Sequence, residues 1–480
     1  MWTSLASMAT RRTRISARKT SYLVSGDAME RSKRILSALL FTPILAFAPD
    51  AALPDARAIT PPEPIIAAHY FGHHWPKNFI SAFRRETVLD DLVRLRADGF
   101  NSVIFLVSWG DVQPVIDPCC QWDERSFERL RFLLASAAAA DLKVILRVGY
   151  AWSFHPQAEP TARRNARLLD EESARDAFLG FVERLARELR PYPQVVMSFM
   201  SWEDQWLRHI APAARKTFDD YTSLLPANQR PGLGSNLPTA HGADAALFNA
   251  YWDWLVMYRL FAPARQRLPN LSYEIRIDKD PYYAVTADGT REIKGWIDHR
   301  AMYRQPSGTP VTIYWAPFWG AKNAGEHLSA QRTGKFLDLL LQETRELSGQ
   351  RDIFIDQFNV VDNTPGYERN AIIAPEEREA FLQEAPCILE RNGVVGYGYW
   401  TTRDYQESPL YNPSFSYGLE GWTLTPASGH PPSESLQVLP SGDTELQLST
   451  GDILEQTVTT AFGRLPTQAD AYPDRVCVEI

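Results

Sequence analysis

RRETVLDDLVRLRADGFNSVIFLVSW, residues 84 to 109, joins one helical pattern to one strand pattern. Val88, Leu92 and Leu95 recur at the spacing of a single helix face, with charged residues between them. Gly99 follows the last turn, where glycine commonly ends a helix. The run 102–109 is apolar and rich in β-branched and aromatic residues, which is typical of a strand buried on both faces. The stretch therefore predicts a helix followed directly by a buried strand.

The same alternation continues along residues 59–405. Amphipathic segments at 173–190, 328–347 and 376–391 lie between further apolar runs. Buried strands that alternate with helices pair in parallel, and eight such units predict a closed (β/α)₈ barrel. A doubly wound open sheet is the alternative, but we find no phosphate-binding turn or switch-point motif for it. The eight runs are IIAAHYF (65–71), SVIFLVSW (102–109), KVILRVGY (143–150), VVMSFM (195–200), LSYEIRI (271–277), PVTIYWAPF (310–318), DIFIDQF (352–358) and VVGYGYW (394–400).

The composition is that of a globular chain with many tryptophans. Of 480 residues, 45% are hydrophobic, 22% are charged and 14 are Trp. The indole ring fills cores, and it also stacks against the apolar face of a sugar ring. The position of each Trp in the fold must therefore decide between a core role and a binding role.

The first 58 residues have the order of a secretory signal. Met29 precedes a basic patch, an apolar run from Ile35 to Ala48 and the sequence Ala56-Arg57-Ala58. We expect a start at Met29 and a secreted or periplasmic protein, with an uncleaved membrane anchor as the alternative. Removing residues 1–58 deletes nine basic and four acidic residues and lowers the formal net charge from −8 to −13. This charge disfavours nucleic acid and anionic membranes as partners.

Motifs of other chemistries are missing from the sequence. The four cysteines, Cys119, Cys120, Cys387 and Cys477, form no C-x-x-C or Cys/His cluster, and His73-His74 has no H-E-x-x-H context. No G-x-S-x-G elbow and no nucleotide-binding P-loop occurs. We therefore expect no metal and no organic cofactor.

Acidic and aromatic residues gather after the apolar runs. Active sites of (β/α)₈ barrels lie at the carboxyl ends of the strands, and Glu203 follows the fourth run by three residues. Carboxylates among aromatic walls suit glycosidic cleavage, in which one acid protonates the leaving oxygen and a second carboxylate acts as nucleophile or base. The candidate sugar contacts are His69, His73, Trp109, Tyr150, Trp152, Trp206, Arg276, Trp315, Trp319, Gln357 and Trp400.

The arrangement resembles the clan of (β/α)₈ glycoside hydrolases that includes cellulases, mannanases and β-galactosidases. The resemblance covers residues 65–405 and rests on Glu203 after strand four, a carboxylate region at strand seven and Trp400 at strand eight. It implies a general acid/base role for Glu203. Trp202 stands where the clan usually has Asn, and Gln357 stands where it has the nucleophilic Glu.

Three interpretations of the second carboxylate follow from Gln357. Asp356 could supply it if the strand is shifted or bulged, because alternation otherwise turns it away from the side of Gln357. Glu274 could supply it from strand five, where it shares a face with Arg276, or it could be a buried partner of Arg276. The third interpretation is a non-catalytic polysaccharide-binding barrel that serves an exopolysaccharide or the cell envelope.

The composition changes after the barrel. We expect a linker at 406–411 and a partial β-sandwich at 412–480, where NPSFSYGLEGW (412–422) resembles the start of jelly-roll carbohydrate-binding modules. A generic β-domain is the alternative reading. The sequence as a whole predicts a glycoside hydrolase acting on a β-linked polysaccharide, with Glu203 and either Asp356 or Glu274 as its carboxylates.

Overall fold

A computed structural model describes the chain over most of the predicted barrel and parts of the tail. The described residues are 63–74, 79–117, 121–150, 155, 157–159, 164, 167–168, 171–200, 214–231, 236–239, 244–275, 280–285, 291–297, 300–303, 308–317, 321, 325–360, 371–403, 410–427, 435–457 and 475–478.

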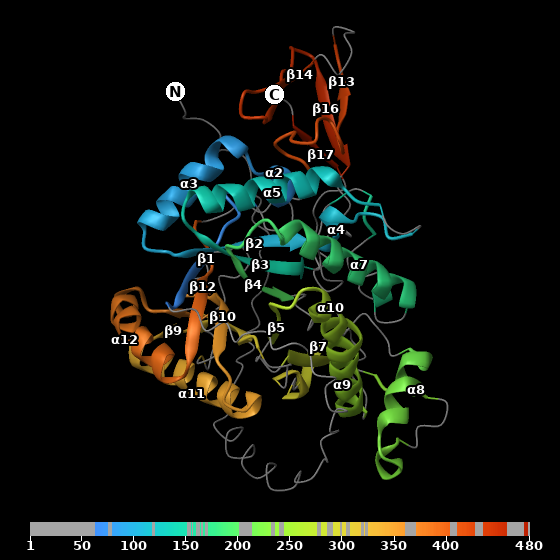
Figure 1. Ribbon diagram of the computed structural model, residues 1–480, viewed down its shortest axis with the longest axis vertical. Coiled ribbons are helices and arrows are strands. Elements are labelled where there is room, and N and C mark those ends of the chain that lie inside the picture. The colour runs from blue at the N-terminus through green and yellow to red at the C-terminus, as the bar shows by residue number, and fades with distance from the viewer. Residues whose placement is uncertain are drawn as a thin grey trace, which may run out of the picture.

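Eight parallel strands close into a barrel (Figure 1). Each predicted run forms one strand, and β1 pairs in parallel with both β2 and β12, which closes the ring. The (β/α)₈ prediction is therefore confirmed, and the open-sheet alternative is wrong. The strands are β1 (Ile65–His69), β2 (Ser102–Ser108), β3 (Lys143–Tyr150), β4 (Val195–Met200), β5 (Leu271–Ile275), β8 (Val311–Trp315), β10 (Ile353–Phe358) and β12 (Val394–Tyr399).

Helices flank the barrel where the amphipathic pattern predicted them. The long ones are α3 (Arg85–Ala97), α5 (Glu124–Ala139), α7 (Glu172–Leu189), α11 (Ala330–Ser348) and α12 (Arg378–Arg391). Val88, Leu92 and Leu95 form the buried face of α3, and Gly99 after it has a φ of 96°, which glycine adopts without steric cost. Within the described residues, no helix combines the length and apolar character needed to cross a bilayer.

Shorter elements fill the connections. The connection from β4 to β5 contains α8 (Arg215–Leu224), η3 (Ala227–Gln229), α9 (Ala245–Trp254), the π-helical η4 (Leu255–Phe261) and α10 (Ala262–Arg267). The others are α2 (Phe79–Ala82), α4 (Trp109–Val112), β6 (Asp280–Val285), β7 (Arg291–Ile297), η5 (Arg300–Tyr303), β9 (His327–Leu328), β11 (Ile372–Ile373) and η7 (Pro375–Glu377).

The strands bury both faces, as their apolar sequences require. Outward side chains join a large core beneath the helices. A separate small core fills the barrel interior, where small and large residues interdigitate. Its members are Ile65, Ala67, Ile104, Ile145, Met197, Phe199 and Phe354.

The tail forms small sheets beside α2, α3 and α5 (Figure 1). One antiparallel sheet has the order β13 (Thr423–Thr425), β16 (Ile453–Thr457), β17 (Arg475–Val478), and β14 (Leu436–Val438) pairs with β15 (Thr444–Leu446). The predicted β-rich tail is thus observed, whereas the jelly-roll module is not confirmed. Tyr411, at the end of the predicted linker, is buried, and its backbone N–H donates to Gln456 at 2.8 Å.

Candidate functional site

Polar side chains collect inside the barrel at the carboxyl ends of its strands. Side chains alternate along a strand, so Arg147 of β3 faces inward two residues after Ile145 of the interior core. By the same spacing, His69 of β1 faces inward two residues after Ala67. Glu274 of β5 and Gln357 of β10 meet Arg147 there. We call Arg147, Glu274 and Gln357 the arginine cluster.

Arg147 is the centre of this cluster. Its Nη2 donates to Oε2 of Glu274 at 3.3 Å, and both side chains are 1% exposed. With the Gln357 amide oriented to satisfy both of its ends, Oε1 accepts from Nη1 and Nη2 of Arg147 at 3.0 Å each. One buried cation therefore holds a carboxylate from β5 and an amide from β10, across the barrel.

The structure pairs Glu274 with a cation that the sequence analysis did not name. Glu274 is buried and ion-paired with Arg147, and the predicted pairing with Arg276 lies outside the described residues. Sequence reasoning did not single out Arg147. The signal was an arginine in the middle of the buried run KVILRVGY, because such a residue needs a partner from another strand.

The β10 strand is irregular around Asp356 and Gln357, where the sequence left open which residue supplies the second carboxylate. Its pairing with β8 shifts register between Ile355 and Gln357, and its pairing with β12 shifts between Ile355 and Phe358. Asp356 lies at this bulge, which meets the condition for bringing it to the side of Gln357. The Asp356 side chain is fully buried.

His69 binds the bulge from β1. Its Nε2 donates to the main-chain oxygen of Asp356 at 2.7 Å, which fixes the hydrogen on that nitrogen. Burial, together with the charge of Arg147, lowers the pKa of His69 to about 3, although the hydrogen bond to Asp356 opposes this shift. His69 is therefore neutral at ordinary pH. Its ring lies 4.8 Å from that of Trp400, centroid to centroid.

Two of the predicted sugar platforms are core residues. The ring of Trp109 packs edge-on against Phe178 of α7 at 5.3 Å, and its Nε1 donates to Gln113 at 2.6 Å. Trp315 faces outward from β8 and stacks on Phe358 at 4.7 Å. They are 3% and 1% exposed, so a sugar reaches neither ring in this structure.

The structure describes only some of the remaining candidate sugar contacts. Trp400 is partly buried beside the arginine cluster, with the Arg147 guanidinium 5.9 Å from its ring centroid. His73 is exposed and accepts from Arg403 at 2.9 Å. Outside the described residues lie Trp152, Glu203, Trp206, Arg276 and Trp319, and the side chain of Tyr150 is not described either.

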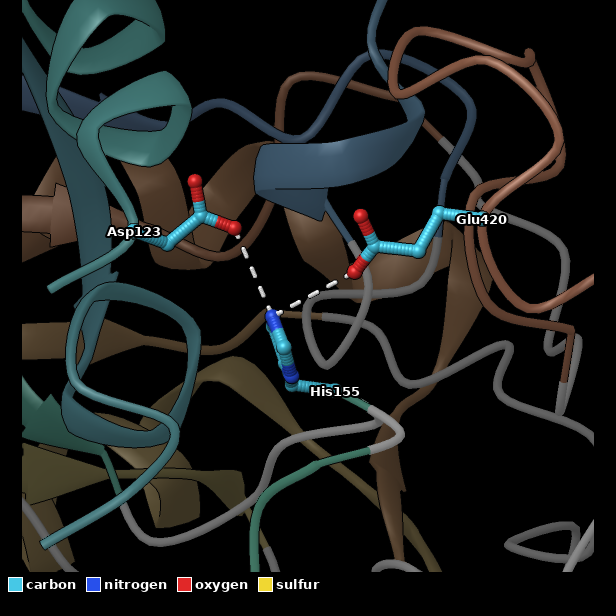
Figure 2. A group of neighbouring side chains, drawn as sticks. All are labelled: Asp123, His155 and Glu420. Carbon is cyan, nitrogen blue, oxygen red and sulfur yellow. Dashed lines mark hydrogen bonds and ion pairs between the residues drawn. The ribbon is translucent and has the colours of Figure 1, made fainter. Parts of the chain in front are cut away.

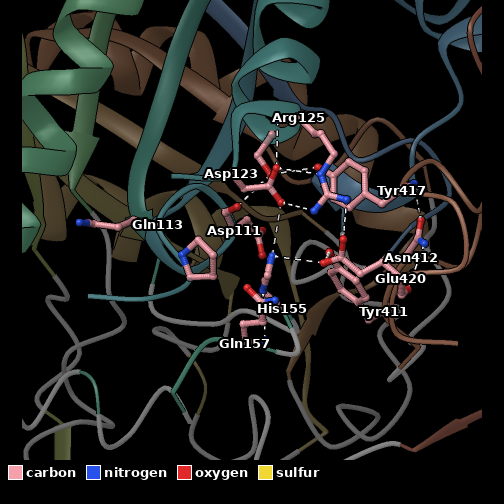
Figure 3. A network of polar contacts seen from close by, with 12 residues as sticks. Asp111, Gln113, Asp123, Arg125, His155, Gln157, Tyr411, Asn412, Tyr417 and Glu420 are labelled. Atoms are coloured by element: carbon pink, nitrogen blue, oxygen red, sulfur yellow. Dashed lines mark hydrogen bonds and ion pairs between the residues drawn. The ribbon is translucent and has the colours of Figure 1, made fainter. Parts of the chain in front are cut away.

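A second polar network lies where the connections after β2 and β3 meet the tail (Figure 3). Arg125 binds Asp123 through Nη2 at 2.7 Å and also binds Glu420. His155 places Nε2 3.4 Å from Asp123 and 3.9 Å from Glu420 (Figure 2). Burial alone would raise the pKa of Asp123, but hydrogen bonds from His155 and Arg125 hold it well below its usual range.

This network offers ligand atoms for a metal ion, but Arg125 already neutralises charge on its carboxylates. One ligand atom each from Asp123, His155 and Glu420 lies within 4.8 Å of the others. The backbone N–H of Gln157 donates to Nδ1 of His155 at 3.2 Å, so Nε2 carries the hydrogen and cannot bind a metal without losing that contact. Arg125 forms ion pairs with the carboxylates of Asp123 and Glu420. The three residues therefore form a hydrogen-bonded network in which Arg125 supplies the positive charge.

The closed barrel with polar groups at its carboxyl end is a (β/α)₈ fold. No protein-family model matches the chain, and no curated protein does either. Solved structures of similar fold include an exo-β-1,4-mannosidase and GH5_18 proteins. The exo-β-1,4-mannosidase Op5Man5 from Opitutaceae bacterium strain TAV5 is 15% identical with a TM-score of 0.47 over 74% of this chain, which spans only 54% of that protein.

Other neighbours have the same level of similarity. A variant of GH5_18 from Streptomyces cattleya in complex with Manβ1-4GlcNAc is 15% identical with a TM-score of 0.49, covering 74% of this chain and 75% of that one. A GH5_18 variant from Bifidobacterium longum subsp. longum, also with Manβ1-4GlcNAc, is 13% identical with a TM-score of 0.47, covering 74% and 73%. Similarity this low assigns no residue roles.

Proposed function

We propose that this protein is a glycoside hydrolase that acts on a β-linked polysaccharide at the carboxyl end of the barrel. The observation that carries the proposal is the ion pair of Glu274 with Arg147 inside the barrel, beside the aromatic ring of Trp400. An enzyme that cleaves glycosidic bonds needs a carboxylate held in a fixed position next to surfaces that receive a sugar.

Glu203 would be the general acid/base and Glu274 the second carboxylate. The geometry favours Glu274 over Asp356, because Glu274 shares the guanidinium of Arg147 with Gln357, the residue at the nucleophile position of the resembling clan. Oε1 of Gln357 accepts from Arg147, which holds the amide in place beside Glu274. A separation of about 5–5.5 Å between the two carboxylates gives retention, and about 6.5–9.5 Å gives inversion.

The test is reducing-end release from a panel of β-glucans, mannans, galactans and bacterial exopolysaccharides. Glu203→Gln and Glu274→Gln should each lower turnover by about 10³-fold or more while leaving binding nearly intact, because each removes a carboxylate needed in the transition state. Asp356→Asn should retain most of the activity. Near-normal turnover in Glu203→Gln would contradict the mechanism, and loss only in Asp356→Asn would exchange the roles of Asp356 and Glu274. The anomer first released, followed by NMR, distinguishes retention from inversion.

The second candidate is a barrel that binds polysaccharide without cleaving it. The amide of Gln357 favours it, because an amide cannot form a covalent glycosyl intermediate. Calorimetric binding of a glycan from the same panel, with no reducing ends released by the wild-type protein, would support this function and exclude hydrolysis.

We also propose export through residues 29–58. The proposal rests on the basic, apolar and A-x-A order of that segment. N-terminal sequencing of the mature protein should find a start directly after Ala58, and a mature chain that retains Met29 would contradict export by cleavage.

A further inference from the structure

We propose that the tail is part of the glycan site, in which Glu420 holds His155 and thereby positions Gln157 and Glu159 in the connection that follows β3. This inference rests on the proposed function for its substrate, but not for its geometry. The tail here means residues 410–427 and 435–457. In this proposal the tail forms part of the carboxyl end of the barrel and is not a separate, tethered carbohydrate-binding module.

The tail contacts the connections that follow three successive strands. Both carboxylate oxygens of Asp443 accept from the first backbone N–H groups of α3, Arg85 at 2.9 Å and Glu86 at 3.1 Å. The hydroxyl groups of Tyr417 and Ser126, near the start of α5, lie 2.9 Å apart. Helix starts that follow parallel strands lie at the carboxyl end of a barrel. The tail therefore covers the catalytic side of the fold.

Glu420 and His155 make the contact with the third connection (Figure 2). His155 is 1% exposed although it belongs to a loop. Because Nδ1 accepts from Gln157, Nε2 points its hydrogen at Asp123 and Glu420. The ring of Tyr411 packs against the imidazole at 5.4 Å, and its hydroxyl donates to Glu420 at 3.3 Å.

Residues that follow His155 in the sequence offer polar groups that a glycan could meet. Gln157 lines a cavity of about 460 Å³ between the connections after β2 and β3. Asp117, Glu159 and Arg167 also line it, and no member of the arginine cluster does. Fixing His155 therefore fixes one wall of a polar cavity that is separate from the proposed catalytic groups.

Amide hydrogen exchange of the full-length chain tests the positioning role without relying on activity. Peptides covering 155–171 should exchange about tenfold faster in His155→Ala, which loses both carboxylates, and about threefold faster in Glu420→Ala, which loses one. Glu420→Gln keeps an acceptor oxygen and should recover most of the protection. Asp443→Asn is the matched control, because it alters a buried carboxylate of the same tail that contacts α3 instead.

The KM values of the variants should rank in the same order as their exchange rates. KM for the cleaved glycan should rise about tenfold in His155→Ala and about threefold in Glu420→Ala, with kcat within about twofold and Asp443→Asn unchanged in KM. Exchange of 155–171 that is equal in Glu420→Ala and Asp443→Asn would overturn the proposal. If the wild-type protein neither binds nor cleaves any glycan, the proposed function fails, while the exchange data still decide whether Glu420 positions the loop.

Discussion

Replacing Arg147 by Met removes the cation of the arginine cluster, which Glu274 contacts at 3.3 Å. Methionine has a similar length and no charge, so Glu274 would stay in a site where its side chain is 1% exposed. Removing one partner of a buried ion pair costs about 3–5 kcal/mol, because the remaining charge loses a buried counter-charge. Gln357 would also lose both donors to its Oε1.

A loss of this size is a large part of the total stability of a domain, which is about 5–15 kcal/mol. Urea unfolding at pH 7, followed by tryptophan fluorescence, measures it. The double variant Arg147→Met/Glu274→Gln should regain part of the loss, because a neutral amide costs less to bury than a carboxylate whose arginine has been removed. A cost that stays the same in the double variant would show that packing, and not charge, is lost.

A surface ion pair supplies the control. Arg96 of α3 also lies 3.3 Å from its carboxylate, Asp141, but the two side chains are 43% and 90% exposed. Arg96→Met should cost less than about 1 kcal/mol, because water already screens the pair. If Arg147→Met is no more destabilising than Arg96→Met, burial does not increase the cost of breaking the Arg147–Glu274 pair, which contradicts this prediction.

Three further outcomes test the placement of single residues. Trp109→Ala should lower the free energy of unfolding by about 3–5 kcal/mol in urea, because it empties a core site against Phe178; wild-type stability would place that ring outside the core. His69 has a folded-state pKa of about 3 against 6.5 unfolded, so the unfolded chain binds the extra proton below pH 6.5. Stability of the wild type should therefore fall more steeply than that of His69→Gln from pH 6.5 toward pH 4, by up to about 1.4 kcal/mol per pH unit, and parallel urea midpoints would contradict this. Gln357→Glu puts a second carboxylate on Arg147 and should destabilise by about 1–3 kcal/mol at pH 7, with recovery at pH 5 as one carboxylate takes up a proton; equal stability at both pH values would argue against a shared guanidinium.

The sequence by itself determined the elements and their order. Apolar runs such as 143–150 and helix ends such as Gly99 act locally, because burial and backbone conformation depend on neighbours a few residues away. Eight alternating units leave few ways to bury every strand, so the closed barrel followed from the pattern. The location of Glu274, Asp356 and Gln357 within barrel strands followed as well.

The tertiary structure alone decided which side chains meet. Arg147 and Glu274 are 127 residues apart, and no local pattern pairs them. The register shift in β10 depends on both neighbouring strands, and the outward turn of Trp315 depends on its position in β8. The docking of Glu420 beside His155 likewise required the tail to fold back on the barrel. Such contacts form only when closure of the sheet fixes the relative positions of distant strands, which one-dimensional periodicity does not specify.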